Sequence, residues 1–206
     1  MKNFKLVLVA LMGILMMTTS CSKDDDENTP SPVDGLKTGD LILSRATEYG
    51  EDWIYFSFEE GEVEINDQES SLDWDIAFNR YNVRTNSGTS GNGQGGVYDA
   101  GAVDFTSVLA ANESGYIVDD SIQILESISN MGPTFITTTG SDVFIGCVVR
   151  INQTGSYETN NHIYVVKTAQ GKYAKVWIKG YYSANSEPGF INMKYAYQSG
   201  DGMNLE

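Results

Sequence analysis

The stretch that most constrains the fold lies within residues 72–101. Trp74, Ile76 and Phe78 stand on one parity of this segment, and polar side chains such as Asp75 and Asn79 stand on the other. A period of two residues is typical of a half-buried β-strand. The segment therefore predicts a strand, and a helix is excluded there.

The segment that follows this strand, residues 84–96, holds five glycines among serine, threonine, asparagine and glutamine. So few β-carbons can neither hold a helix nor fill a core. A phosphate cradle would need a lysine and a helix directly behind the loop, and neither is present. The segment therefore predicts a long polar loop between two strands.

Short strand patterns recur along the chain, separated by glycine turns, and they predict a mostly antiparallel all-β domain. The expected strands are 40–44, 52–58, 62–65, 74–79, 134–138, 143–151, 162–168, 172–181 and 190–197. Residues 169–172, with Gly171, read as a hairpin turn. Residues 103–112 and 118–129 have an ambiguous period and are expected to form one or two short helical segments.

The chain begins with the pattern of a signal peptide, expected over residues 1–20. Lys2 and Lys5 precede an apolar run over 6–17, which is too short to span a bilayer comfortably. Cys21 stands where bacterial lipoproteins are cleaved and acylated, although an ordinary secreted protein is the alternative. Residues 21–38 are acidic and poor in apolar groups, which predicts a lipidated flexible tether before a domain over 39–206.

The balance of charge restricts the partners. The chain has 28 acidic and 13 basic residues and a net charge of −15. Residues 1–20 contain two lysines and no acidic residue, so their loss would change the net charge to about −17. A protein with so large a negative charge repels nucleic acid. Nucleic-acid binding is therefore excluded. Cys147 lies in an apolar run and is expected to be a buried thiol without a nucleophilic role.

Several segments resemble the HmuY family, haem-binding lipoproteins of anaerobic Gram-negative bacteria. DWDIAF (73–78) followed by RTNSGTSGNGQGG (84–96) is similar to the signature of that family, and 161–182 and 190–198 resemble its later strands. SKDDDE (22–27) resembles the acidic tag that sends some lipoproteins of these bacteria to the outer face of the cell. The resemblance implies an outer-membrane lipoprotein that takes haem, from host haemoproteins among other sources, and passes it to a TonB-dependent outer-membrane receptor.

The resemblance also implies two axial ligands to haem iron, Met131 and His162. Imidazole and thioether groups are the usual axial ligands, and family members use two histidines or two methionines at corresponding places. His162 is the one histidine of the chain, and a mixed pair departs from that pattern. A thioether favours ferrous iron. The alternatives are that Met131 fills a hydrophobic gap and that His162 only starts a surface strand.

Other residues could line a haem pocket, the aromatic ones by stacking and the basic ones by pairing with propionates. They are Tyr157, Tyr164, Arg84, Arg150 and Lys167. A metal-free β lipoprotein that binds a glycan or a protein is the competing hypothesis. An enzyme is not expected: Asp73 and Asp75 could mimic a carboxylate pair, but no complementary catalytic set surrounds them.

Overall fold

The computed structural model describes residues 35–47 and 50–206. The chain divides into a unit Met1–Ser31 and a unit Pro32–Glu206, and the described residues all belong to the second. The expected signal peptide, the expected lipidation site Cys21 and most of the expected tether lie outside the described residues. The strand β1 begins at Leu36, so residues 36–38 of the expected tether belong to a sheet.

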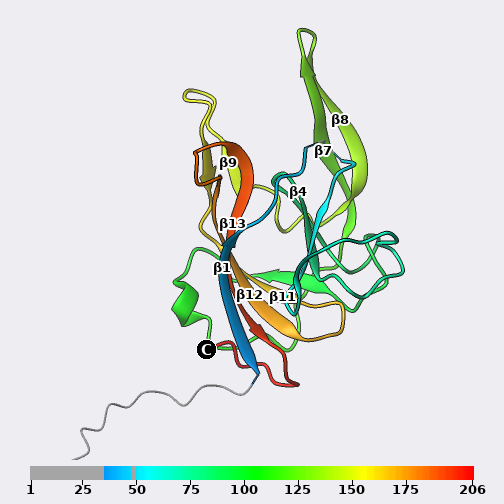
Figure 1. Cartoon of the computed structure of the whole chain (residues 1–206), viewed down its shortest axis with the longest axis vertical. Coiled ribbons are helices and arrows are strands. Elements are labelled where there is room, and N and C mark those ends of the chain that lie inside the picture. Colours follow the sequence, from blue (N-terminus) through cyan, green and yellow to red (C-terminus); the bar gives the residue numbers. More distant parts are fainter. Residues whose placement is uncertain (1–34, 48–49) are drawn as a thin grey trace, which may run out of the picture. The chain divides into compact units, whose positions relative to one another are not determined.

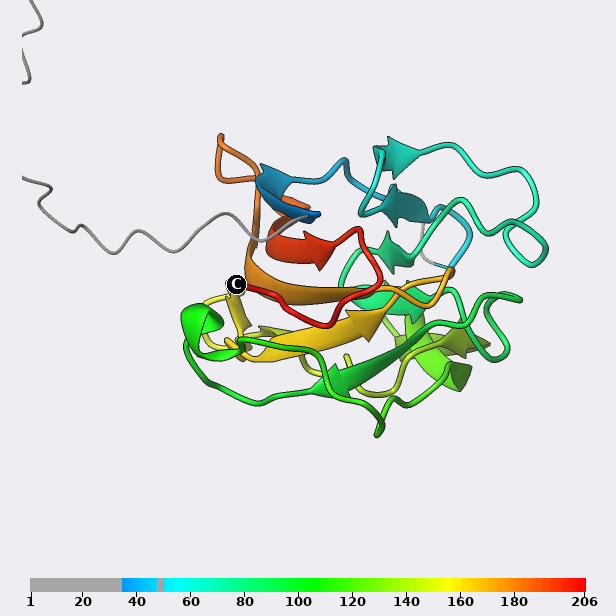
Figure 2. The same cartoon turned by 90° about the horizontal axis from the view of Figure 1, so that it is seen from below.

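The regular elements of the described unit are antiparallel strands apart from one short 3-10 helix, as the sequence predicts. The larger sheet has five strands in the order β1(Leu36–Ile42), β13(Pro188–Gln198), β12(Tyr173–Tyr182), β11(Ile163–Lys167) and β6(Gly96–Asp99). Figure 2 shows these five strands side by side, from blue β1 to green β6. A smaller sheet has the order β3(Gly61–Val63), β2(Ile54–Ser57), β4(Ile76–Asn79) and β5(Asn82–Thr85).

Two separate hairpins complete the fold. One pairs β7(Asp120–Ser129) with β8(Gly132–Gly140), and the other pairs β9(Val148–Arg150) with β10(Tyr157–Thr159). In Figure 1 both hairpins project toward the top of the view, and β10 packs beside the end of β12, where Tyr157 N–H donates to the Tyr182 hydroxyl at 2.7 Å. They therefore offer two arms at one end of the unit.

The main core contains the inward-facing side chains of both sheets. Phe56 and Ile76 from the smaller sheet share this cluster with Val166, Val176 and Met193 from the larger one. Alternate positions of each strand enter the core, which accounts for the period of two. Cys147 is part of the cluster, and burial raises the pKa of its thiol to about 12, as expected for an inert thiol.

The glycine-rich loop is confirmed, and it connects β5 to β6. It wraps around the buried side chain of Asn86, whose Nδ2 donates to the carbonyls of Ser71 and Trp74, both at 2.9 Å. Its Oδ1 accepts the Gly93 N–H at 3.0 Å. A β-carbon at Gly93 would lie 2.5 Å from the Asn86 carbonyl oxygen, so glycine is needed for a close approach of backbone to backbone.

Of the two expected helical segments, the one at 118–129 is wrong and the one at 103–112 is confirmed only as a single short 3-10 helix. Residues 118–129 were expected to be helical, but Asp120–Ser129 is the strand β7. A bulge between Leu125 and Ser127 shifts the register of the hairpin and breaks the alternation that would have revealed a strand. Residues 103–112 contain only a short 3-10 turn, Phe105–Ser107.

The expected strand at 143–151 is also too long, because only Val148–Arg150 pairs. Turn hydrogen bonds join Ile145 N–H to the Asp142 carbonyl and Cys147 N–H to the Phe144 carbonyl, both within the preceding segment. Gly146 has a φ of +84°, which continues this turn. An apolar run is thus compatible with a buried turn as well as with a strand.

Candidate functional site

An apolar cavity of about 330 Å³ lies at the base of the β7–β8 hairpin. It is lined by Tyr81, Asn82, Val83, Ile122, Gln123, Ile124, Leu125, Phe135, Ser141, Phe144, Ile145, Gly146, Val148 and Val149. Two of these side chains are unusually exposed for their type, Phe135 at 58% and Ile145 at 68%. An apolar surface that is open to solvent in this way is a feature of ligand and partner sites.

One polar group in the wall of this cavity has no partner. Ser141 is 2% exposed, and its hydroxyl makes no hydrogen bond to any residue that the structure describes. Its backbone N–H donates to the Val83 carbonyl at 2.9 Å. A buried hydroxyl without a partner costs free energy, so a polar atom of a ligand in the cavity would be stabilised there.

The β7–β8 hairpin is fixed to the rest of the unit at its root. Arg84 donates from Nε to the Thr139 carbonyl at 2.9 Å and from Nη2 to Thr138 Oγ1 at 2.8 Å. Directly before β7, Asp119 accepts from the backbone N–H and the hydroxyl of Thr85, at 2.9 and 2.6 Å. Burial raises the pKa of Asp119 to about 6. The hairpin arm is thus fixed by buried polar contacts.

Met131 lies at the tip of this hairpin, in the turn between β7 and β8. Met131 is 99% exposed and therefore does not pack against any side chain of residues 35–47 and 50–206, His162 included. A thioether in this position is free to accept a ligand. It does not fill a gap in the core.

His162 lies at the start of β11 and pairs with Asp99, which ends β6. The ring Nδ1 is 2.8 Å from Asp99 Oδ2 and 3.0 Å from Oδ1. Both side chains are one third exposed. Among the residues described, Nε2 of the ring makes no hydrogen bond. Asp99 therefore holds one nitrogen of the imidazole, and the other nitrogen is available to a ligand.

His162 is connected to the apolar cavity through two aromatic rings. Phe144 lines the cavity, and its ring centroid lies 4.3 Å from that of Tyr164. The Tyr164 ring lies 6.2 Å from His162. His162 does not line the cavity itself, so the structure does not bring the two expected ligands together.

The other expected pocket residues are dispersed. Tyr164 is buried, burial raises the pKa of its hydroxyl, and its oxygen accepts from Asn160 Nδ2 at 2.8 Å. Tyr157 packs on Tyr181 in the β9–β10 arm, with ring centroids 4.7 Å apart. Arg150 is exposed on β9. These three residues lie on the elements that surround the apolar cavity and His162.

Arg84 and Lys167 occupy other surroundings. The Arg84 guanidinium is buried, stacks 3.8 Å above the Trp53 ring and already has the two hydrogen bonds to β8. It lies on the face of β5 opposite Val83, which lines the cavity. Lys167 is the last residue of β11, at the opposite end of the strand from His162. Neither residue is placed to meet a ligand in the cavity.

Sequence reasoning missed Asp99 and Asp119. Asp99 is 63 positions from His162, and Asp119 is 34 from Thr85. No local pattern marks either contact, because each depends on strand pairing between distant segments. Asp99 directly follows a short apolar run and stands two positions before Gly101. This pattern is the only sequence signal that could have suggested the end of a strand there.

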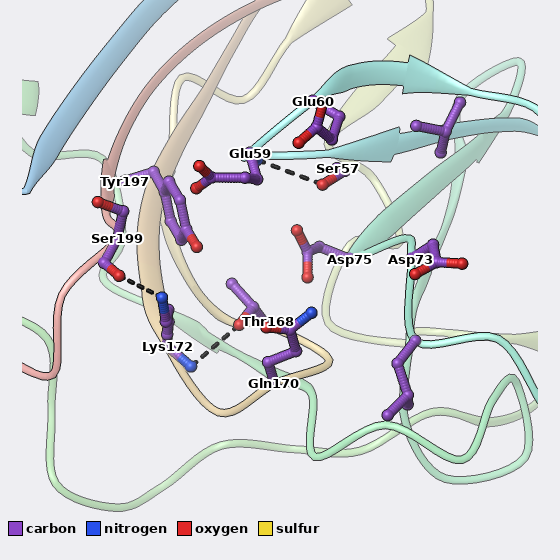
Figure 3. Close-up of a pocket in the computed structure, with 12 residues that line it drawn as sticks. Ser57, Glu59, Glu60, Asp73, Asp75, Thr168, Gln170, Lys172, Tyr197 and Ser199 are labelled. Atoms are coloured by element: carbon purple, nitrogen blue, oxygen red, sulfur yellow. Dashed lines mark hydrogen bonds between the residues drawn. The ribbon is translucent and has the colours of Figure 1, made fainter.

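A second cavity, of about 400 Å³, is polar and lies between the β2–β3 hairpin and the β11–β12 turn (Figure 3). Glu59, Glu60, Asp73 and Asp75 contribute carboxylates, and Lys172 contributes an amine. Asp75 is buried and accepts backbone N–H groups from Phe58 and Ala169 at 2.9 and 3.0 Å. Its carboxylate therefore ties the two sheets together, and burial raises its pKa.

Over residues 35–47 and 50–206, no group of three or more histidine, cysteine or acidic side chains is placed to hold a metal ion. In the same residues, no helix has the length and apolar character needed to cross a membrane.

Comparison with known proteins places the chain in a family. The model of the HmuY protein family matches residues 50–195, which is well over half of the chain. The chain belongs to the HmuY family. The match includes both hairpin arms, the glycine-rich loop and His162. No curated protein matches the chain.

Solved structures with the HmuY-like fold agree with this assignment. A Bacteroides vulgatus protein provisionally described as HmuY-like and haem-binding is 25% identical, with a TM-score of 0.58 over 77% of this chain and 90% of that one. The HmuY analogue of Tannerella forsythia in its apo form is 19% identical, with a TM-score of 0.63 over 82% and 99%. Apo PinO of Porphyromonas gingivitis is 17% identical, with a TM-score of 0.58 over 80% and 98%. The last two show the fold alone.

Proposed function

We propose that this HmuY-family protein binds haem, with Met131 and His162 as the axial ligands. The observation that carries the proposal is the state of the single histidine, whose Nδ1 is held by Asp99 while Nε2 is available. Haem supplies an iron with two axial positions, which imidazole and thioether side chains can fill. The description of a neighbouring HmuY-like protein as haem-binding supports the same function.

Met131 and His162 are apart in this structure, so the support from side chains comes from those around the apolar cavity. The exposed apolar side chains Phe135, Ile145 and Val149 would cover a porphyrin face that is otherwise unfavourable in water. The exposed guanidinium of Arg150 is a donor for propionate oxygens. A fully exposed thioether at Met131 is a soft donor and would favour ferrous iron.

The test is a haem titration followed by absorbance, in the ferric state and again after dithionite. We expect a saturable Soret shift in the wild type that weakens in Met131→Ala and in His162→Ala. Met203→Ala, at a half-buried methionine near the C-terminus, is the matched control and should bind as the wild type does. Absence of a shift in both oxidation states would overturn the proposal and favour a metal-free β lipoprotein that binds a glycan or a protein.

We also propose that the protein is lipid-anchored through Cys21 at the outer membrane, faces the cell exterior and delivers haem to an outer-membrane receptor. The support is the leader pattern and the acidic run after Cys21 in the sequence. Protease treatment of intact cells, with wild type and Cys21→Ser compared, tests this location. Wild type should be cleaved and membrane-bound, and Cys21→Ser should leave the membrane fraction. Protection of the wild type would contradict surface exposure.

A further inference from the structure

We infer that Asp99 is a positioning residue for His162: its carboxylate holds the ring with the proton on Nδ1 and directs Nε2 toward haem iron. This inference rests on the proposed haem function and goes beyond it, because it assigns a role to a residue outside the ligand pair. It also predicts how the oxidation-state preference of the site is set.

Strand pairing brings the two residues together. Asp99 on β6 lies directly opposite Tyr164 on β11. Directly opposed residues of antiparallel strands share a face, and so do residues two apart on one strand. Tyr164, Asp99 and His162 therefore lie on one face of the sheet, with His162 diagonal to Asp99. Further pairing of Ile163 N–H with the Gly101 carbonyl at 2.9 Å continues this register beyond β6.

The carboxylate is itself held in place. Gly101 N–H donates to Asp99 Oδ1 at 2.7 Å, so one oxygen has a backbone donor while both oxygens face the ring. The backbone of His162 is fixed from the other side, because its N–H donates to Asn160 Oδ1 at 3.0 Å. Among the described residues, each side-chain nitrogen and oxygen of Asp99 and His162 except Nε2 thus has a hydrogen-bond partner.

The direction of the hydrogen bond follows from the chemistry of the two groups. An ionised carboxylate can only accept, so Nδ1 must carry the proton. In a neutral ring the lone pair is then on Nε2, which is the atom that a metal binds. A carboxylate behind the imidazole makes it a stronger donor to the metal. Asp99 would therefore favour ferric iron and oppose the preference of the Met131 thioether for ferrous iron.

The first experiment uses the protein without haem and without a histidine tag. Because the chain has one histidine, two-dimensional ¹⁵N NMR of the imidazole reports its tautomer without ambiguity. At a pH where these signals show a neutral ring, we expect the wild type to carry its proton on Nδ1. Asp99→Asn and Asp99→Ala should move the population toward Nε2–H. Asp201→Asn, at an exposed aspartate without a side-chain hydrogen bond, is the control and should leave it unchanged.

The second experiment measures the reduction midpoint of the haem complex by spectroelectrochemistry. Loss of an outer partner of a metal-bound histidine typically changes metal affinity by about 10–100-fold. We expect Asp99→Asn to raise the ratio of ferrous to ferric affinity by about tenfold, which is a positive shift of about 59 mV for a one-electron couple. Asp201→Asn should keep the wild-type midpoint. If Asp99→Ala fails to fold, the isosteric Asp99→Asn still decides the result.

The outcomes separate the two proposals. If the wild type binds no haem, or binds it equally well in His162→Ala, the proposed ligand fails whatever Asp99 does. If haem binds through His162 but Asp99→Asn changes neither tautomer nor midpoint, the role of Asp99 is wrong and the haem function stands. A changed tautomer with an unchanged midpoint would confirm that Asp99 positions the ring and would overturn its effect on the oxidation-state preference.

Discussion

At the scale of single residues, buried polar side chains fix the irregular parts of this fold. Asn86 is fully buried and meets Ser71, Trp74 and Gly93 with three hydrogen bonds. Asp119 makes a comparable set of contacts with Thr85 at the hairpin root. The glycine-rich loop has little apolar area of its own, so its conformation depends on these polar contacts, which also fix the root of the hairpin.

Asp119 gives the protein a pH dependence of stability. Its pKa rises from 3.8 in an ordinary setting to about 6 in the folded state, because burial disfavours the charged form. The folded state therefore holds this proton more tightly than the unfolded state does, and the contribution to stability falls as pH rises from about 4 to about 6. The full difference corresponds to about 3 kcal/mol.

Urea unfolding at several pH values between 4 and 7 measures this effect. We expect Asp119→Asn to have a smaller loss of unfolding free energy across that window than the wild type, whatever its stability at the acidic end. Burial raises the pKa of Asp75 as well, so part of the pH dependence of the unfolding free energy should remain in the variant. An equal pH dependence of the unfolding free energy in the two proteins would show that Asp119 is not the group responsible.

At the scale of elements, the glycines of the 86–95 loop are explained by contact distance. A β-carbon at Gly93 would lie 2.5 Å from the Asn86 oxygen and 2.8 Å from the Ala169 Cα, which are both backbone atoms. We expect Gly93→Ala to lower the unfolding free energy by about 1–3 kcal/mol, as overpacking does. Gly202→Ala, with nothing closer than 3.9 Å and no positive φ, is the control. Chemical denaturation compares them, and equal midpoints would contradict the packing explanation.

The β7–β8 arm should depend on Arg84 for its rigidity. Arg84→Met removes two hydrogen bonds to β8 and the charged stack on Trp53, which together stabilise the root by about 1–3 kcal/mol. We expect faster hydrogen exchange over residues 120–140 and unchanged exchange over 173–198, measured by mass spectrometry of peptides. Arg84→Lys should give an intermediate result, because an ammonium lacks the fork that meets two acceptors. Uniform acceleration in both regions would indicate global destabilisation instead.

The regular elements could be predicted from sequence where β-branched and aromatic residues are dense and turn residues bound the segment. The strands β4, β11, β12 and β13 are of this kind, and Gly171 marks the turn between β11 and β12. The bulge after Leu125 hid β7, and the turn at Gly146 shortened β9. In both places tertiary contacts replace the local period, and no single-sequence pattern contains that information.

At the scale of the whole molecule, haem binding should be visible as stability. A ligand that binds only the folded state adds RT ln(1 + [L]/Kd), about 2.7 kcal/mol at one hundred times Kd. We therefore expect the thermal midpoint of the wild type to rise with haem concentration and that of His162→Ala to rise less. Differential scanning calorimetry measures both, with Asp201→Asn as the matched variant. An identical rise in His162→Ala would place the haem elsewhere on the molecule.

The candidate site was only partly predictable because its parts come from distant segments. Residue type alone singled out His162, the one histidine, and the tip position of Met131 follows from the turn between two strands. The apolar cavity and Asp99 depend on how β6, β7, β8 and β9 are arranged. The charge of Arg84 suggested that it pairs with haem propionates. In the structure its guanidinium is buried against Trp53 and stabilises the fold.

The exposure of Met131 carries a chemical liability. Of the methionines at 131, 193 and 203, Met193 is fully buried and only Met131 stands almost wholly in solvent. Peroxide should therefore convert Met131 to its sulfoxide first, replacing a soft sulfur donor by a polar, oxygen-bearing group. An oxidative burst would then reach this arm of the protein before it reached the core, and a sulfoxide reductase would be needed to restore the thioether.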